Sequence, residues 1–205
     1  GANLRYAWKP NKNGIFKVSL NGNYNLSGIA VPNPYAYISD SAATDSFSKQ
    51  FSHLGDTINF KTQDQYYNSN VSYRQLYKNK YSLYTAASYI LNQTRNSFGG
   101  IPIDENDHRA QFRIEGTDYF TPRLDLMVGS DIQSYGISKK FDNYYKQEFT
   151  ETIASGYAEL QWTPINLLAI KPGVRYEHSV LLNKNDIAPR FSMAIKTGNH
   201  SQASF

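Results

Sequence analysis

The chain has 205 residues, a formal net charge of +4 and no cysteine, which excludes disulfides and thiolate metal sites. Its 21 lysines and arginines are interspersed with 17 aspartates and glutamates, so no basic run points to nucleic acid as a partner. The sequence lacks the run of about eighteen apolar residues that a transmembrane helix needs. The length suits one all-β domain, and we expect residues 1–205 to form a single unit.

Aromatic residues are abundant in a chain whose mean hydropathy is that of a polar protein. They comprise 17 Tyr, 11 Phe and 2 Trp. A transmembrane β-barrel alternates apolar residues facing lipid with polar residues facing inward, and it collects aromatic residues at the two membrane interfaces. The composition therefore favours a membrane barrel over a soluble core.

Period-two alternation of apolar and polar residues recurs along the chain, while helical periodicity is nearly absent. We predict about ten strands: residues 3–9, 15–29, 64–78, 80–93, 108–120, 123–136, 149–163, 167–180, 187–197 and a last one from 200. A strand of about 14 residues tilted by about 45° rises roughly 33 Å, which is enough to cross a bilayer. Strands of globular proteins commonly have only about five or six residues.

The connections between these strands alternate between short and long. Short turns with Gly, Pro or Asn are expected at 11–14, 78–80, 121–123, 164–166 and 197–199. Longer connections are expected at 31–62, 94–107, 137–148 and 181–186. A barrel that crosses a bilayer produces this alternation, because its inner turns are short and its outer loops are longer. The pattern predicts an antiparallel up-and-down transmembrane β-barrel, with a soluble sheet that has one wet face as the alternative.

The alternation also separates two faces of the predicted sheet. In the strand 108–120, for example, Ala110, Phe112 and Ile114 alternate with polar residues, so the apolar face is expected to meet outer-membrane lipid. The charged residues on the opposite face are expected to line the lumen and to pair across strands, and a gating role is the alternative. These lumen-facing residues are Arg113, Glu115, Glu159, Lys171, Arg175 and Glu177.

The C-terminal fifty or so residues carry a family resemblance. The segments Gly156–Pro164, Lys171–Glu177 and Asn185–Ser192 follow one another in an order and spacing that resembles consecutive barrel strands of TonB-dependent outer-membrane receptors. Pro189 fits the start of a strand, where a missing N–H is least costly. Over the remainder of the chain the resemblance is architectural only.

This resemblance implies a location in the outer membrane of a Gram-negative bacterium. It implies a barrel of about 22 strands closed by a plug domain, a short segment engaged by TonB, and energised import of a siderophore, cobalamin or a glycan. We expect this chain to be a central part of such a barrel, with the plug and the TonB-engaging segment elsewhere in the system. A small free-standing barrel and a soluble β-sheet binding module are the alternatives.

The connection 31–62 is the main candidate for ligand contact, because a loop of this length in a compact fold is commonly functional. We expect it to be extracellular. Its aromatic residues are expected to stack on a small-molecule or glycan ligand, although packing within the loop explains them equally well. The candidate ligand-binding residues are Tyr35, Tyr37, Phe47 and Phe51.

No catalytic group, cofactor or metal is expected. The four histidines are scattered without metal-ligand spacing, and no nucleophile is accompanied by a recognisable base. The acidic segment 104–108 has oxygen ligands that could hold Ca²⁺, but its spacing matches no calcium loop, and a solvated loop is favoured. We therefore expect a transporter component and not an enzyme.

Overall fold

A computed structural model describes residues 1–36, 55–142, 144–198 and 201–205. These residues form ten β-strands and contain no helix that is long and apolar enough to cross a membrane. The strands are β1 (Ala2–Asn11), β2 (Gly14–Pro32), β3 (Thr57–Tyr77), β4 (Tyr81–Phe98), β5 (Ile101–Thr121), β6 (Leu124–Phe141), β7 (Tyr145–Ile165), β8 (Leu168–Ser179), β9 (Lys184–Lys196) and β10 (Gln202–Ser204).

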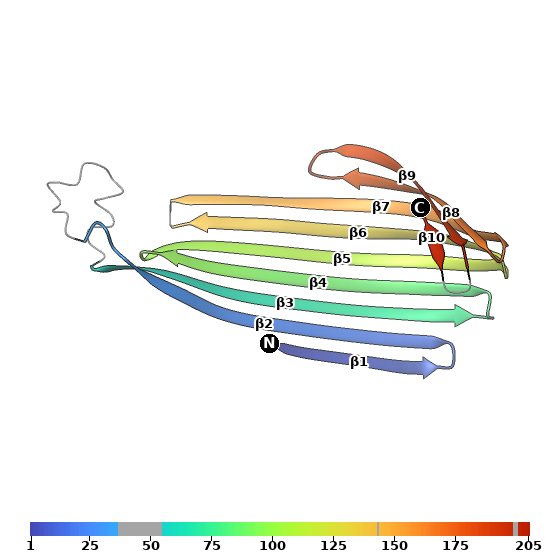
Figure 1. Cartoon of the computed structure of the whole chain (residues 1–205), viewed down its shortest axis with the longest axis horizontal. Coiled ribbons are helices and arrows are strands. Elements are labelled where there is room, and N and C mark those ends of the chain that lie inside the picture. Colours follow the sequence, from blue (N-terminus) through green and yellow to red (C-terminus); the bar gives the residue numbers. More distant parts are fainter. Residues whose placement is uncertain (37–54, 143, 199–200) are drawn as a thin grey trace.

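The ten strands make one antiparallel sheet in which each strand pairs with its neighbours in sequence. Figure 1 shows them side by side in chain order, with β2 to β7 along the long axis and β8 to β10 bending across that direction. In the part of the chain that the structure describes, β1 and β10 form the two edges of the sheet. The predicted all-β, up-and-down architecture is confirmed.

The predicted tight turns lie where their residues allow a sharp reversal. Between β3 and β4, Lys78 and Asn79 adopt φ angles of 50° and 53°, in the left-handed region. Short connections also follow β1, β5 and β7, as the Asn, Gly and Pro residues there predict. Because these signals depend on a few consecutive residues, the sequence locates them well.

The predicted alternation of short turns with long loops is wrong beyond β3. The segment 94–107 is not a loop, because β4 continues to Phe98 and β5 begins at Ile101. Gly99 and Gly100, with φ angles of 55° and 90°, form the turn between them. The segment 137–148 shortens in the same way to the three residues between β6 and β7, and 181–186 shortens to four between β8 and β9.

The physical reason is that these strand ends carry polar or charged residues on both faces and so do not alternate as a membrane-facing strand does. At about 3.3 Å per residue and a tilt of about 45°, a strand of 21 residues such as β5 rises roughly 50 Å, more than the hydrocarbon core of about 30 Å. Its outer third therefore extends into water, where no apolar face is needed. The connection expected at 31–62 is also shorter, since β2 ends at Pro32 and β3 begins at Thr57.

Burial in this sheet is the reverse of that in a soluble protein. On β6, Asp131 is 1% exposed, whereas Val128 and Ile132, which point to the opposite face, are 52% and 51% exposed. Among the described residues, Ile58 is the sole apolar side chain that is buried. A sheet whose apolar face is open and whose polar face is packed matches a strand layer with lipid on its outside. It does not match a soluble sheet, whose apolar face is covered.

Candidate functional site

A polar cluster with many hydrogen bonds lies on one face of β5 to β8. This face is opposite the exposed apolar face that carries Val128 and Ile132, and it is called the inner face. In the observed register, Arg113 on β5 lies opposite Asp131 on β6, which lies opposite Ser155 on β7, which lies opposite Glu177 on β8. Residues that are directly opposite in an antiparallel pair point to the same face. The four side chains therefore form one row across four strands.

Asp131 is the centre of this cluster. Its Oδ2 accepts a hydrogen bond from Arg175 Nη1 at 3.0 Å, and its Oδ1 accepts one from Arg175 Nη2, also at 3.0 Å. Ser155 Oγ donates to Oδ1 at 2.8 Å, and Gln133 Nε2 donates to the same oxygen at 3.2 Å. The Asp131–Arg175 ion pair is bidentate and almost fully buried. The carboxylate is therefore strongly bound, and removing its partner would leave a buried charge at a large cost in free energy.

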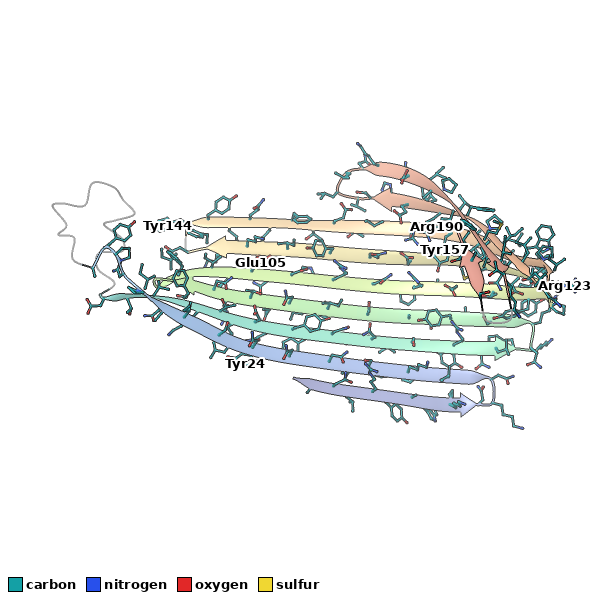
Figure 2. All side chains as sticks on the ribbon, in the orientation of Figure 1. Tyr24, Glu105, Arg123, Tyr144, Tyr157 and Arg190 are labelled. Atoms are coloured by element: carbon teal, nitrogen blue, oxygen red, sulfur yellow. The ribbon has the colours of Figure 1, made fainter. Side chains whose placement is uncertain are left out.

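Arg175 also connects the row to the next one. Its Nε donates to Glu177, and its guanidinium carbon lies 5.5 Å from the centre of the Tyr157 ring. The Tyr157 hydroxyl donates to Glu115 Oε2 at 2.9 Å. Figure 2 shows Tyr157 toward the end of the sheet that carries the β1–β2 turn, whereas Glu105 lies toward the opposite end.

The Tyr157 ring lies flat over Gly129, its cross-strand partner on β6. A Cβ at position 129 would lie 2.4 Å from Cζ of that ring, a distance at which the ring would have to move. The absence of a side chain at Gly129 therefore leaves room for the Tyr157 ring on the sheet. Aromatic rings that cover a cross-strand glycine in this way stabilise β-sheets. The ring in turn carries the hydroxyl to Glu115 and one face to Arg175.

All six residues expected to face the lumen lie on this same face, and the structure brings them into contacts. Lys171 Nζ lies 3.1 Å from Glu159 Oε1, and Arg113 Nη2 lies 3.6 Å from Asp131 Oδ2. The sequence analysis did not identify Asp131, Ser155 or Tyr157 as members of the cluster. The alignment of Asp131 with Ser155 depends on the short connection between β6 and β7, which was expected to be a long loop, and the reach of Arg175 across β7 is not visible in the sequence.

A second polar site closes the base of the long connection between β2 and β3. Asn33 is buried, its Nδ2 donates to the Gly55 carbonyl at 2.8 Å, and its Oδ1 accepts from the Tyr35 amide at 3.0 Å. Its own amide donates to the Asp56 carbonyl at 2.8 Å. Asn33 thus holds the two ends of this connection together, a role that its sequence context did not reveal.

Of the four candidate ligand-binding residues, Tyr35 lies among the described residues. Tyr35 lies beside Asn33 at the base of the long connection. Tyr37, Phe47 and Phe51 lie outside the described residues. The four residues stay candidates for ligand contact on the strength of the sequence.

The acidic segment 104–108 lies within β5, so its side chains alternate between the two faces and do not converge. Asp104 pairs with Arg95 at 3.7 Å, and Glu105 pairs with Lys139 at 3.2 Å. Within the described residues, no group of three or more His, Asp or Glu side chains could hold a metal ion. These carboxylates act as cross-strand ion-pair partners at the outer strand ends.

The opposite face of the sheet is apolar and open along its whole width. Large side chains that share this face and are exposed include Leu4, Tyr6, Trp8, Leu20, Tyr67, Val71, Tyr89, Phe112, Ile114, Val128, Ile132, Trp162, Val174 and Tyr176. An apolar area of this extent is far larger than soluble monomers leave in water, and lipid is the solvent that suits it.

Known proteins share the fold of this chain but not its sequence. No known family profile matches the sequence, and no curated protein matches it. Solved structures do match the fold. The ferric enterobactin receptor PfeA of Pseudomonas aeruginosa superimposes with a TM-score of 0.61 and 12% identity over 98% of this chain and 31% of its own. The siderophore receptor PirA of Acinetobacter baumannii gives a TM-score of 0.61 and 14% identity, covering 96% of this chain and 31% of its own.

The chain has the fold of a segment of a siderophore-receptor barrel. A third match, the outer membrane transporter YddB of Escherichia coli, has a TM-score of 0.50 and 12% identity over 95% of this chain and 36% of its own. The chain spans about a third of the length of these proteins. At these identities the likeness concerns the fold, and at that level it confirms the predicted resemblance, the barrel segment and the outer-membrane location.

Proposed function

We propose that this barrel segment belongs to an outer-membrane uptake receptor that binds and imports a siderophore, a glycan or a similar scarce nutrient. The observation that carries the proposal is the reversed burial of the sheet, in which the Asp131–Arg175 pair is packed on one face while Val128 and Ile132 are open on the other. A transport barrel needs this pattern, because its wall separates lipid from a polar lumen. The matching structures include two siderophore receptors, which supports the same class.

In this proposal the polar face of β5 to β8 lines the lumen, and the long connection between β2 and β3 lies outside the cell. Tyr35, Tyr37, Phe47 and Phe51 then contact the ligand before it enters the barrel. The plug domain and the TonB-engaging segment lie elsewhere in the system. We propose no catalytic role, since the acidic and hydroxyl groups of the inner cluster are occupied by one another.

The orientation of the two faces can be tested with adjacent residues of β6. Single cysteines at Met127 and Val128, in the full protein in outer-membrane vesicles, are modified with a water-soluble and with a bilayer-partitioning maleimide. We expect the cysteine at 128 to react with the bilayer reagent and the one at 127 to be shielded from it. The reverse result, or equal labelling of both positions, would exclude this orientation.

The transport role is tested by uptake. Cells that lack the gene should lose growth or labelled-ligand uptake on at least one member of a panel of ferric siderophores and oligosaccharides, and the full-length gene should restore it. Replacing Tyr35 and Tyr37 together with alanine should reduce uptake about tenfold at limiting ligand, because stacking on aromatic rings supplies roughly 0.5–1.5 kcal/mol per pair. Unchanged uptake in this variant, at equal receptor abundance, would remove the loop from the ligand site.

A further inference from the structure

The inner face of β2 to β4 carries two cations that form no ion pair among the described residues. Lys17 on β2 and Arg74 on β3 point to this face, and neither has an ion-pair partner within the described part of the chain. Arg74 lies over the Tyr84 ring, with 5.1 Å from its guanidinium carbon to the ring centre. Of the carboxylates that follow on β5 and β6, Asp131 is paired with Arg175, whereas Glu115 accepts a hydrogen bond from the neutral Tyr157 hydroxyl and lines a separate hollow together with Arg74.

Between Lys17 on β2 and Arg113 on β5 the surface of the sheet is hollowed. The side chains there are short, and the hollow has a volume of about 250 Å³. Its lining includes Asn70, Ser72, Tyr84, Ala86, Ser88 and Arg113. In the register, Ser72 and Ala86 lie in one row between Lys17 and Arg113. This row spans three strand spacings, about 14 Å, so the two long cationic side chains flank the small ones.

Arg113 is incompletely satisfied on the side of this hollow. One terminal nitrogen lies 3.6 Å from Asp131, whose two oxygens are already bound by Arg175. The Nε of Arg113 is buried and has no hydrogen-bond partner among the described residues. Because that nitrogen is buried, an anionic oxygen in the hollow would bind the exposed part of the Arg113 guanidinium, whose side chain is 39% exposed.

We propose that this hollow, which is lined by Arg113 and has Lys17 and Arg74 directly opposite its lining residues Ser72 and Tyr84, is a binding site for a carboxylate or similar oxyanion. The inference builds on the proposed function, in which this face lines the lumen. The oxyanion comes either from a soluble ligand in the lumen or from an acidic side chain of the same protein that enters the lumen. Both sources present the same chemistry to the three cations.

The test uses the rate at which a single cysteine in the hollow reacts with charged reagents. This chain has no cysteine, so Ser88→Cys introduces a defined thiol once any cysteine elsewhere in the full-length protein is replaced. The purified protein in detergent is treated with a sulfonate-bearing and an ammonium-bearing methanethiosulfonate of similar size. We expect the anionic reagent to react about tenfold faster, because a surface potential of a few kT concentrates anions to that extent.

A matched control lies on the same strand and the same face. Asn92 is four residues from Ser88, and its cross-strand partners are Tyr66 and Asp107. At Asn92→Cys the preference for the anionic reagent should be absent. Reaction at Asn92 also shows that the face is aqueous, so a failure of the anion site is distinguishable from a failure of the proposed orientation.

The outcomes separate the two sources of the oxyanion. If citrate slows the anionic reagent at Ser88→Cys, and Lys17→Gln with Arg74→Gln abolishes the preference, a soluble anion reaches the site. If Ser88→Cys is protected from both reagents and the same double substitution exposes it, the oxyanion belongs to the protein itself. Equal reagent preference at positions 88 and 92, or protection that survives the double substitution, overturns the proposal.

Discussion

The inner face of β5 to β8 differs from that of β1 to β4. On β5 to β8, opposite charges lie within one network around Asp131 and Arg175, and that network is buried without any further partner. On β1 to β4, neutral amides bind one another, as Asn70 does to Asn68 at 2.8 Å, and Lys17 has no ion-pair partner within the described part of the chain. The Asp131–Arg175 pair is satisfied within the first region, while the second region has the composition of a surface that binds a partner or ligand.

The outer face shows no such difference. Leu20 and Tyr67 on β2 and β3 are exposed in the same way as Phe112 and Val128 on β5 and β6. Because lipid makes the same demand along the whole wall, the outer face is uniform. The contrast between the two regions therefore arises from what each inner surface contacts, and substitutions can test it.

The largest effect is expected at Asp131. Asp131→Asn removes the charge that balances Arg175 and leaves a buried guanidinium without its bidentate partner, so the free energy of unfolding should fall by about 3–5 kcal/mol. Urea titration of the full protein in lipid vesicles measures this change. The control is Glu105→Gln, whose partner Lys139 is half exposed, where the loss should stay below about 1 kcal/mol. Equal losses at the two positions would remove the distinction between a buried network and ordinary surface pairs.

A smaller loss is expected at Gly129. Gly129→Ala places a methyl group against the Tyr157 ring and displaces its hydroxyl from Glu115, which should cost about 1–3 kcal/mol. Gly116→Ala is the matched control on β5, because the nearest atom to its added Cβ is a carbonyl oxygen 4.0 Å away. Adding Tyr157→Ser to Gly129→Ala should cost less than the sum of the single changes. Strict additivity would show that the ring and the glycine are independent.

At the base of the long connection, Asn33→Ala should cost about 1–2 kcal/mol, because Gly55 and Tyr35 lose buried hydrogen bonds. The change should be local. We expect faster proteolysis between β2 and β3 with little effect on the β5 to β8 network, and Asn25→Ala on the exposed part of β2 should leave the cleavage rate unchanged. Slower or unaltered cleavage in Asn33→Ala would argue against a clamp at this position.

The smallest effect is expected at Arg74, the cation of the incomplete region. Arg74→Gln removes a cation–π contact to Tyr84 at an exposed site, which is worth about 0.5–1 kcal/mol in the same urea titration. Lys61→Gln, on the same strand, should change stability by less than about 0.5 kcal/mol. A loss at Arg74 as large as that at Asp131 would mean that β1 to β4 depends on its charges as strongly as β5 to β8 does.

Local signals in the sequence located the tight turns and the two faces correctly. The residues between β3 and β4 and between β5 and β6 form turns by their own conformational preferences, and period-two alternation assigned Arg113 and Phe112 to opposite faces. The same rules failed at 94–107 and 137–148. Polar strand ends that extend beyond the membrane have no apolar face, so they resemble loops until their pairing is known.

The candidate site was predicted in part. The six residues expected to face the lumen share one face of the sheet, but Asp131 as the partner of Arg175 was not anticipated. These two residues lie 44 positions apart on strands that are not adjacent, and their contact passes over Ser155 on β7.

The sequence by itself determined the strand-rich membrane wall, because alternation, aromatic content and turn residues are properties of short segments that each strand carries alone. Only the tertiary structure decided which charges neutralise one another and which do not. That outcome depends on the register between strands, where a shift of one residue would turn Asp131 toward lipid, and register is fixed by the pairing of whole strands across the sheet.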